Sequence, residues 1–189
     1  MGDASFYPRK GIIQLEQCVE NGDYLFWLFE NLKSLTTGKP PSLVKRLDKR
    51  NGKETHSYRF YTRALFHHWR PHFYHENGVK KLPENFEECL DSTALAVWFL
   101  DDGGRRSDVQ TGVFLTVDTY TLNEIESIQC TLFTRFDLET RYQRNGKSTS
   151  GTIQKRVAIP GDNYTRFFDS VSPVILQIPS MVGKKLKGV

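Results

Sequence analysis

Apolar and polar residues alternate with two different periods along the first half of the chain, and the changes of period predict its elements. Alternation over 12–19 and 57–63 is typical of strands, whereas the spacing of apolar residues over 23–35 is typical of an amphipathic helix. The pair Asn51-Gly52 follows a basic stretch and predicts the tight turn of a β-hairpin. A second helix is predicted over 64–74.

The same order of elements returns in the second half. The predicted strands, helices and turn are strand 112–118, helix 122–136, strand 138–144, a turn at Asn145-Gly146, strand 153–159 and helix 163–174. Asp23 follows Asp3 at the spacing at which Leu122 follows Asp102, so the two copies keep the same register from an aspartate. We therefore predict a tandem β-β-α-β-β-α repeat.

The segment 95–104 (LAVWFLDDGG) is an apolar run that ends in two carboxylates and then two glycines. Its small residues suit close helix packing, and the glycines predict a left-handed C-cap. Asp101 and Asp102 would then lie at the negative end of the helix dipole, where acidic residues are unfavourable. A residue type that costs stability at its position is more typical of chemistry, such as metal binding, than of folding.

The first copy lacks the helix that delivers this aspartate in the second copy, because Met1-Gly2 alone precedes Asp3. We expect an N-terminal extension that carries this helix; a truncated or degenerate first copy is the alternative.

The segment 95–103 resembles the LAGLIDADG motif, with Val97 in place of the first glycine. Three more segments strengthen the resemblance: 57–63 (SYRFYTR), 78–85 (GVKKLPEN) and 178–185 (IPSMVGKK). The chain therefore resembles the LAGLIDADG homing endonucleases and their maturase relatives, and especially the two-motif type of organellar introns.

The resemblance implies an α+β fold with two pseudo-symmetric αββαββα halves, 1–90 and 91–189. Each half would carry a saddle-shaped antiparallel sheet that lies in the DNA major groove, with the first motif helix missing. A single chain would then act as a monomeric pseudo-dimer on double-stranded DNA.

The resemblance also implies the catalytic groups. The last acid of the motif falls on Asp102 and its first-copy counterpart on Asp3, which would bind Mg²⁺ and support a double-strand break; Asp101 is a weaker candidate. Carboxylates and Mg²⁺ suit phosphodiester hydrolysis because they favour deprotonation of the attacking water and neutralise the charge that develops on the leaving oxygen. Lys81 and Lys184 or Lys185 occupy equivalent positions near the ends of the two copies, and we expect them to stabilise the transition state.

Sequence reading would come from arginine, glutamine and lysine side chains on the predicted strands and hairpins, since arginine and glutamine make paired bonds to bases and lysine suits phosphates. The candidates are Arg9, Gln14, Gln17, Lys45, Arg46, Lys49, Arg50, Arg59, Arg63, Arg105, Gln110, Arg141, Gln143, Arg144, Lys147, Lys155 and Arg156.

The composition of the chain is compatible with a folded domain that binds nucleic acid. With 189 residues, 38% of them hydrophobic, the chain can bury a real core, and its net charge of +4 permits a nucleic-acid partner. No apolar run reaches the ~18 residues of a membrane span, so no membrane partner is expected. The histidines at 67, 68, 72 and 75 invite a zinc interpretation, but Pro71 interrupts their helix and no cysteine or glutamate completes a familiar ligand set.

The sequence thus predicts an intron-encoded, Mg²⁺-dependent DNA endonuclease of a chloroplast or mitochondrion. Two alternatives stay open: an RNA-binding maturase that helps its host intron fold and splice, and a degenerate, inactive remnant.

Overall fold

The two halves of the chain fold around separate antiparallel sheets. The computed structural model describes residues 4–7, 10–50, 52–105, 112–147, 151 and 153–186. One compact unit comprises Asp3–Arg70 with Ile178–Met181, and the other comprises Pro71–Gln177 with Val182–Val189.

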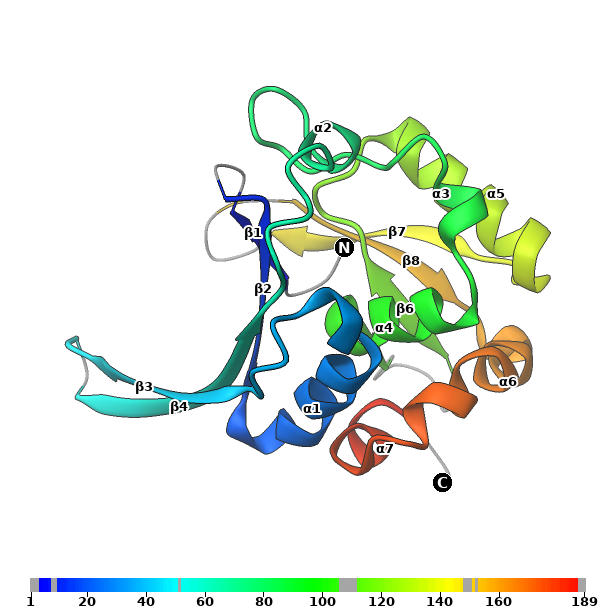
Figure 1. Cartoon of the computed structure of the whole chain (residues 1–189). Coiled ribbons are helices and arrows are strands. Elements are labelled where there is room, and N and C mark those ends of the chain that lie inside the picture. Colours follow the sequence, from blue (N-terminus) through cyan, green and yellow to red (C-terminus); the bar gives the residue numbers. More distant parts are fainter. Residues whose placement is uncertain are drawn as a thin grey trace. The chain divides into compact units, whose positions relative to one another are not determined.

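The sheet of the first unit has four strands in the order β1-β2-β4-β3. These strands are β1 (Ser5–Tyr7), β2 (Ile12–Cys18), β3 (Ser42–Asp48) and β4 (Lys53–Tyr61). Strands β3 and β4 form a long hairpin (Figure 1), and Gly52 adopts a positive φ of 68° in its turn. The predicted hairpin is confirmed, although Asn51 lies outside the described residues.

Helix α1 (Gly22–Asn31) covers one face of this sheet, between the 3-10 turns η1 (Val19–Asn21) and η2 (Lys33–Leu35). The ring centroids of Phe29 and Phe60 lie 5.4 Å apart, as do those of Phe26 and Tyr58. Because strand residues alternate between faces, the residues next to Phe60 point away from α1. We call this second side the open face of the first sheet.

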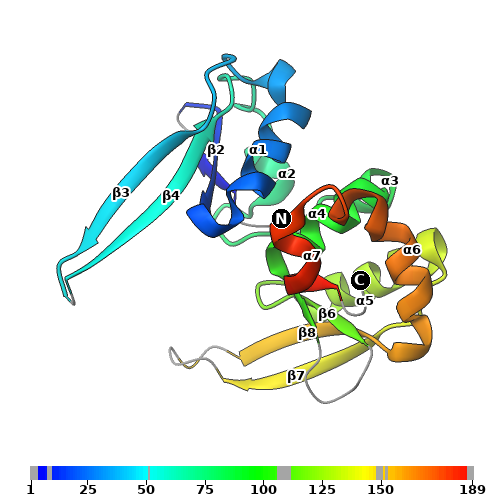
Figure 2. The same ribbon diagram turned by 90° about the horizontal axis from the view of Figure 1, so that it is seen from below.

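The sheet of the second unit repeats the same order as β5-β6-β8-β7. Its strands are β5 (Gly103–Arg105), β6 (Val113–Thr116), β7 (Arg141–Lys147) and β8 (Ile153–Ile159). Helices α4 (Ser92–Asp102), α5 (Leu122–Phe136) and α6 (Tyr164–Ile175) lie on one side of it (Figure 2), above a core that fully buries Leu115 and Val157. The other side is the open face of the second sheet.

The equal strand orders confirm the predicted repeat. Leu15 pairs with Phe60 in the first sheet, and Leu115 pairs with Val157 at the same place in the second. Helices α1 and α5 also follow β2 and β6 in the same sequence position of each copy.

The predicted helix over 64–74 is wrong, because only α2 (Arg70–Phe73) is helical there. The backbone N–H of Phe66 donates to the Gly11 carbonyl at 2.9 Å, which ties this segment to β1–β2 in place of helical bonding. Pro71 has no N–H to give, which suits the first turn of a short helix and not a helix interior.

The predicted turn at Asn145-Gly146 is also wrong, since both residues belong to β7. The pairing with β8 shifts register between Arg144 and Lys147, and Gly146 has a positive φ of 74°. The glycine therefore permits a bulge within the strand, and the end of the hairpin falls outside the described residues.

Short helices complete the described structure: α3 (Phe86–Cys89), the 3-10 turn η3 (Gly161–Asn163) and α7 (Pro179–Lys185). No helix among the described residues combines the length and apolar character needed to cross a membrane.

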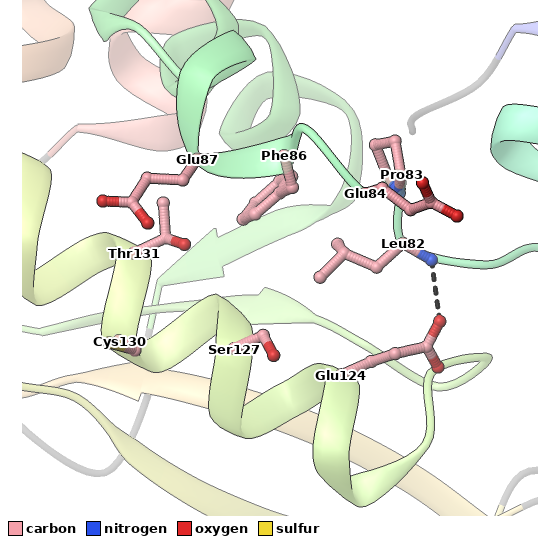
Figure 3. A pocket seen from close by; sticks show the side chains of 9 residues that line it. All are labelled: Leu82, Pro83, Glu84, Phe86, Glu87, Glu124, Ser127, Cys130 and Thr131. Carbon is pink, nitrogen blue, oxygen red and sulfur yellow. Dashed lines mark hydrogen bonds between the residues drawn. The ribbon is translucent and has the colours of Figure 1, made fainter.

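The segment 71–90 clusters with the second unit, although we expected the halves to divide at residue 90. The Leu82 N–H donates to Glu124 Oε1 of α5 at 2.7 Å, and the Phe86 and Trp98 rings meet edge to face at 6.0 Å. The segment thus leaves a pocket of about 420 Å³ against α5 (Figure 3).

Glu124 joins this segment to the helix start. It forms a capping box with Thr121 and also accepts the Leu82 N–H. Burial alone would raise the pKa of the Glu124 carboxyl, but the hydrogen bonds from Leu82 and Thr121 outweigh it and lower the pKa.

We expect Glu124→Ala to lower the free energy of unfolding by about 2 kcal/mol, because it removes a helix cap and leaves the Leu82 N–H without its acceptor. Urea denaturation would measure the change. Glu126→Ala, at an exposed position of the same helix, is the matched control and should change stability by less than about 0.5 kcal/mol. Equal effects of the two substitutions would contradict the role of Glu124.

Candidate active site and nucleic-acid interface

The two acidic residues singled out in the sequence are the last residues of α4. Asp101 and Asp102 are both half-buried there, and β5 begins at the very next residue. Two negative charges in the last turn oppose the helix dipole, so some other group has to offset them.

Lys185 of α7 supplies that offset. Its Nζ is buried at the end of α4 and donates to the carbonyls of Phe99 (3.1 Å) and Gly103 (2.6 Å). A cation that bonds the last carbonyls of a helix is favourable both as a cap and against the dipole. Lys184, by contrast, is exposed, so of the two lysines proposed from the sequence it is Lys185 that contacts the end of the motif helix.

The two glycines after Asp102 serve close packing. We expected a left-handed C-cap, and this is wrong: Gly103 has φ −93° and ψ 163°, an extended conformation. A Cβ on Gly103 would lie 2.1 Å from a ring carbon of Phe99, and one on Gly104 would lie 2.6 Å from the ring of Phe114. Glycine is needed because α4 turns directly into β5 against these rings.

Tyr120 lies close to the Asp102 carboxylate in the core of the second unit. Burial raises the pKa of the Tyr120 phenol well above its usual value, and the negative charge of Asp102 raises it further. Tyr120 therefore stays protonated at neutral pH.

Lys81 and Asp3 are the other catalytic candidates. Lys81 is half-buried, and its backbone N–H donates to the Phe73 carbonyl at 2.9 Å. Asp3 lies outside the described residues, so its role stays a prediction from the repeat.

The donor set at the end of α4 suits Mg²⁺ better than a metal held wholly by protein. No group of three histidine, cysteine, aspartate or glutamate side chains within the described residues could hold a metal ion, and this includes the histidines near Pro71. Mg²⁺ commonly uses one or two carboxylates and takes its other oxygens from water and substrate phosphates. One half-buried Asp102 carboxylate fits that pattern.

The open face of the first sheet gathers several of the predicted DNA-contacting residues. Paired strand residues share a face, so Gln14, Arg46 and Arg59 lie on this side. Gln17 pairs with Tyr58 and faces the α1 side. Arg63 is exposed beyond β4, and its Nε donates to the Thr36 carbonyl at 2.6 Å.

Glu16 stands among these arginines and was missed in the sequence. Its carboxylate accepts hydrogen bonds from Arg46, Arg59 (2.7 Å) and Ser57 (2.5 Å), and from Gln14 (3.1 Å). The Arg46 hydrogen bond is the largest cause that lowers the pKa of the Glu16 carboxyl from 4.5 to about 2. The alternation of β2 places Glu16 on the face of Gln14, a signal that the sequence did contain.

The second sheet also divides its candidates by face. Arg141, Gln143 and Arg156 lie on the open face. Arg144 and Lys155 face the helices, where Lys155 Nζ donates to the Tyr120 carbonyl. Arg105 is exposed at the end of β5, and its Nη1 donates to the Leu186 carbonyl at 3.1 Å.

The remaining candidates lie at hairpin ends or outside the described residues. Lys45, Lys49 and Arg50 are exposed on the β3–β4 hairpin. Arg9, Gln110 and the side chain of Lys147 are not among the described positions.

Comparison with known proteins identifies relatives over most of the chain. The model of the LAGLIDADG DNA endonuclease family matches residues 1–167. Cytochrome b mRNA maturase bI2 of Debaryomyces hansenii is 27% identical over 189 residues, which cover 96% of this chain and 68% of that protein. The protein of the same name from Saccharomyces cerevisiae is 24% identical over 196 residues, and this chain spans 44% of its length.

Two solved structures share the fold. The homing endonuclease I-WcaI bound to its DNA recognition sequence aligns with a TM-score of 0.79 and 23% identity, over 100% of this chain and 82% of that chain. Mesophilic variants of the homing endonuclease I-DmoI align with a TM-score of 0.57 and 11% identity, over 90% of this chain and 88% of theirs. The predicted α+β fold with two antiparallel sheets is confirmed.

The two neighbouring lysines of α7 give a matched test of the site. We expect Lys185→Met to lower the free energy of unfolding by about 2–3 kcal/mol, because it removes charged hydrogen bonds to the carbonyls of Phe99 and Gly103. Lys184→Met should change it by less than about 0.5 kcal/mol. Urea denaturation of both variants checks this, and similar losses for the two would show that Lys185 does not stabilise the end of α4.

Proposed function

The chain belongs to the LAGLIDADG DNA endonuclease family, and we propose that it is a site-specific, metal-dependent DNA endonuclease encoded in an organellar intron. The observation that carries this proposal is the end of α4. There Asp102 is kept half-buried beside the open edge of a sheet, at a stability cost that Lys185 offsets.

Asp102 would bind Mg²⁺ in the second half, and Asp3 is the equivalent ligand that we propose for the first. Bound Mg²⁺ would supply Lewis-acid activation of water and charge neutralisation at the scissile phosphate. Lys185 stabilises the carboxylate end of the helix, because its Nζ donates to the backbone carbonyls of Phe99 and Gly103. The raised pKa keeps Tyr120 a neutral phenol at neutral pH, so it adds no negative charge near Asp102.

The open faces of the two sheets would contact the DNA. Arginine and glutamine side chains there can reach base edges, and the exposed lysines of the β3–β4 hairpin suit phosphates. The chain would act as a monomer, with two halves that read the two sides of the target.

A maturase is the second candidate function. It is favoured by the curated relatives, which are called cytochrome b mRNA maturases and match over 96% of this chain. In that case the same basic surfaces would bind host intron RNA, and Asp102 would not be needed. The gene would in either case lie in a mitochondrial or chloroplast genome.

We expect Asp102→Asn to reduce cleavage by at least about 100-fold, because the amide cannot supply the anionic oxygen that Mg²⁺ requires. The assay would incubate the chain with Mg²⁺ and duplex DNA that joins the exons on either side of its reading frame. Asp101→Asn is the matched control and should retain most of the activity if Asp102 is the ligand. Binding of the same duplex should be equal for all three proteins.

Failure of the wild-type protein to cut this DNA, together with tight binding of the intron RNA by both wild type and Asp102→Asn, would overturn the endonuclease proposal in favour of the maturase.

A further inference from the structure

The two halves hold equivalent arginines in different ways. Arg59 of β4 pairs with Glu16 of β2, and Arg156 of β8 pairs with Thr116 of β6 at the same place in the repeat. The first half therefore has a carboxylate where the second half has a hydroxyl. Because both arginines lie on open faces, this difference affects the surfaces proposed to contact DNA.

In the first half, one carboxylate holds two guanidinium groups. Arg46 uses both Nη atoms on the two oxygens of Glu16, and its Nη1 also donates to the Ser57 hydroxyl at 3.1 Å. Arg59 uses Nε on Glu16 at 2.7 Å and Nη1 on the Tyr61 hydroxyl at 3.0 Å. The Glu16 side chain is only 17% exposed, so solvent screens these ion pairs less than it screens surface pairs.

These contacts leave the two arginines unequal. The two-pronged edge of Arg46 is spent on Glu16, so it cannot pair with a guanine at the same time. On Arg59, Nη2 is not used in the contacts with Glu16 and Tyr61. Glu16 thus holds Arg59 in one orientation, and Arg46 is bound to the same carboxylate.

In the second half, the guanidinium group of Arg156 lies over the aromatic ring of Phe114. The guanidinium carbon of Arg156 lies 4.0 Å from the centroid of Phe114, and Gly104 makes room for that ring. A ring orients a guanidinium through its face, whereas a carboxylate also cancels one charge.

We propose that Glu16 is a positioning residue for recognition: it holds Arg59 in a fixed orientation for reading a base, binds Arg46 through the same carboxylate, and keeps both guanidiniums off the phosphate backbone. This inference rests on the proposed DNA binding. Its consequence is that the first half contributes sequence discrimination, with less of the non-specific attraction that two unpaired arginines would add.

Glu16→Gln tests this, because it keeps the shape and removes the charge that fixes the arginines. Glu30→Gln is the matched control: it makes the same change of net charge in the same unit, on exposed residue 30 of α1. Fluorescence anisotropy would measure binding to two duplexes, one selected from a randomised library by the wild-type protein and one of unrelated mixed sequence.

For Glu16→Gln we expect the ratio of the two affinities to fall about tenfold, because Arg59 loses the orientation in which it contacts a base. Affinity for the unrelated duplex should rise, and its dependence on salt should steepen by about 0.9 in log–log slope for each phosphate newly contacted. Glu30→Gln should leave both the ratio and the slope unchanged. An unchanged ratio for Glu16→Gln, or an equal loss in both variants, would overturn the role of Glu16.

A stability measurement without DNA tests the positioning itself. Because the pKa of Glu16 is lowered from 4.5 to about 2, the stability that its charge provides is present at neutral pH and is lost as the pH falls from about 4.5 towards about 2. The wild type should lose more stability than Glu16→Gln over this range. Parallel curves of the free energy of unfolding against pH would contradict the ion pairs of Glu16 with Arg46 and Arg59. A wild type that selects no duplex from the library would overturn the proposed function and this role in recognition together, whereas a wild type that discriminates between the two duplexes isolates the result for Glu16.

Discussion

The second unit depends on the balance of charge at the end of α4. Two carboxylates end this helix where its own dipole is negative, and the buried ammonium of Lys185 answers them by bonding the carbonyls of Phe99 and Gly103. The cation therefore offsets the negative charge at the backbone end of the helix. The arrangement therefore tolerates the carboxylates while leaving Asp102 at the margin of the sheet.

Close packing fixes the position of these carboxylates. Gly103 is both the C-cap of α4 and the first residue of β5, so no loop separates the helix from the sheet. The Phe99 and Phe114 rings occupy the space that a Cβ would need at the two glycines. As a result, the packing of Gly103 and Gly104 against these rings also sets the distance of the helix end from the open face of the second sheet, where Gln143 and Arg156 lie.

Periodicity in the sequence predicted the repeat and most elements, because strands and helices that bury one face must show it in their pattern. It failed where long-range contacts decide. The helix expected over 64–74 is replaced by a segment whose Phe66 N–H bonds to distant Gly11, and Asn145-Gly146 forms a bulge because β8 continues to pair beyond it. Neither partner is visible from local sequence.

The site shows the same limit. The acids at the end of α4 could be found from their cost to the helix, but the choice between Lys184 and Lys185 could not, because only the packing of α7 decides which one is buried. Glu16 was overlooked because an acid on a strand is unremarkable until its neighbours are known to be Arg46 and Arg59, from strands distant in the sequence.

The net charge of +4 likewise hides that several cations bond the protein itself: Arg63, Arg105 and Lys155 all donate to backbone carbonyls. Attraction to a phosphate backbone depends on the remaining cations and is common to DNA and RNA. The distinction between an endonuclease and a maturase therefore rests on whether the Asp102 carboxylate is required.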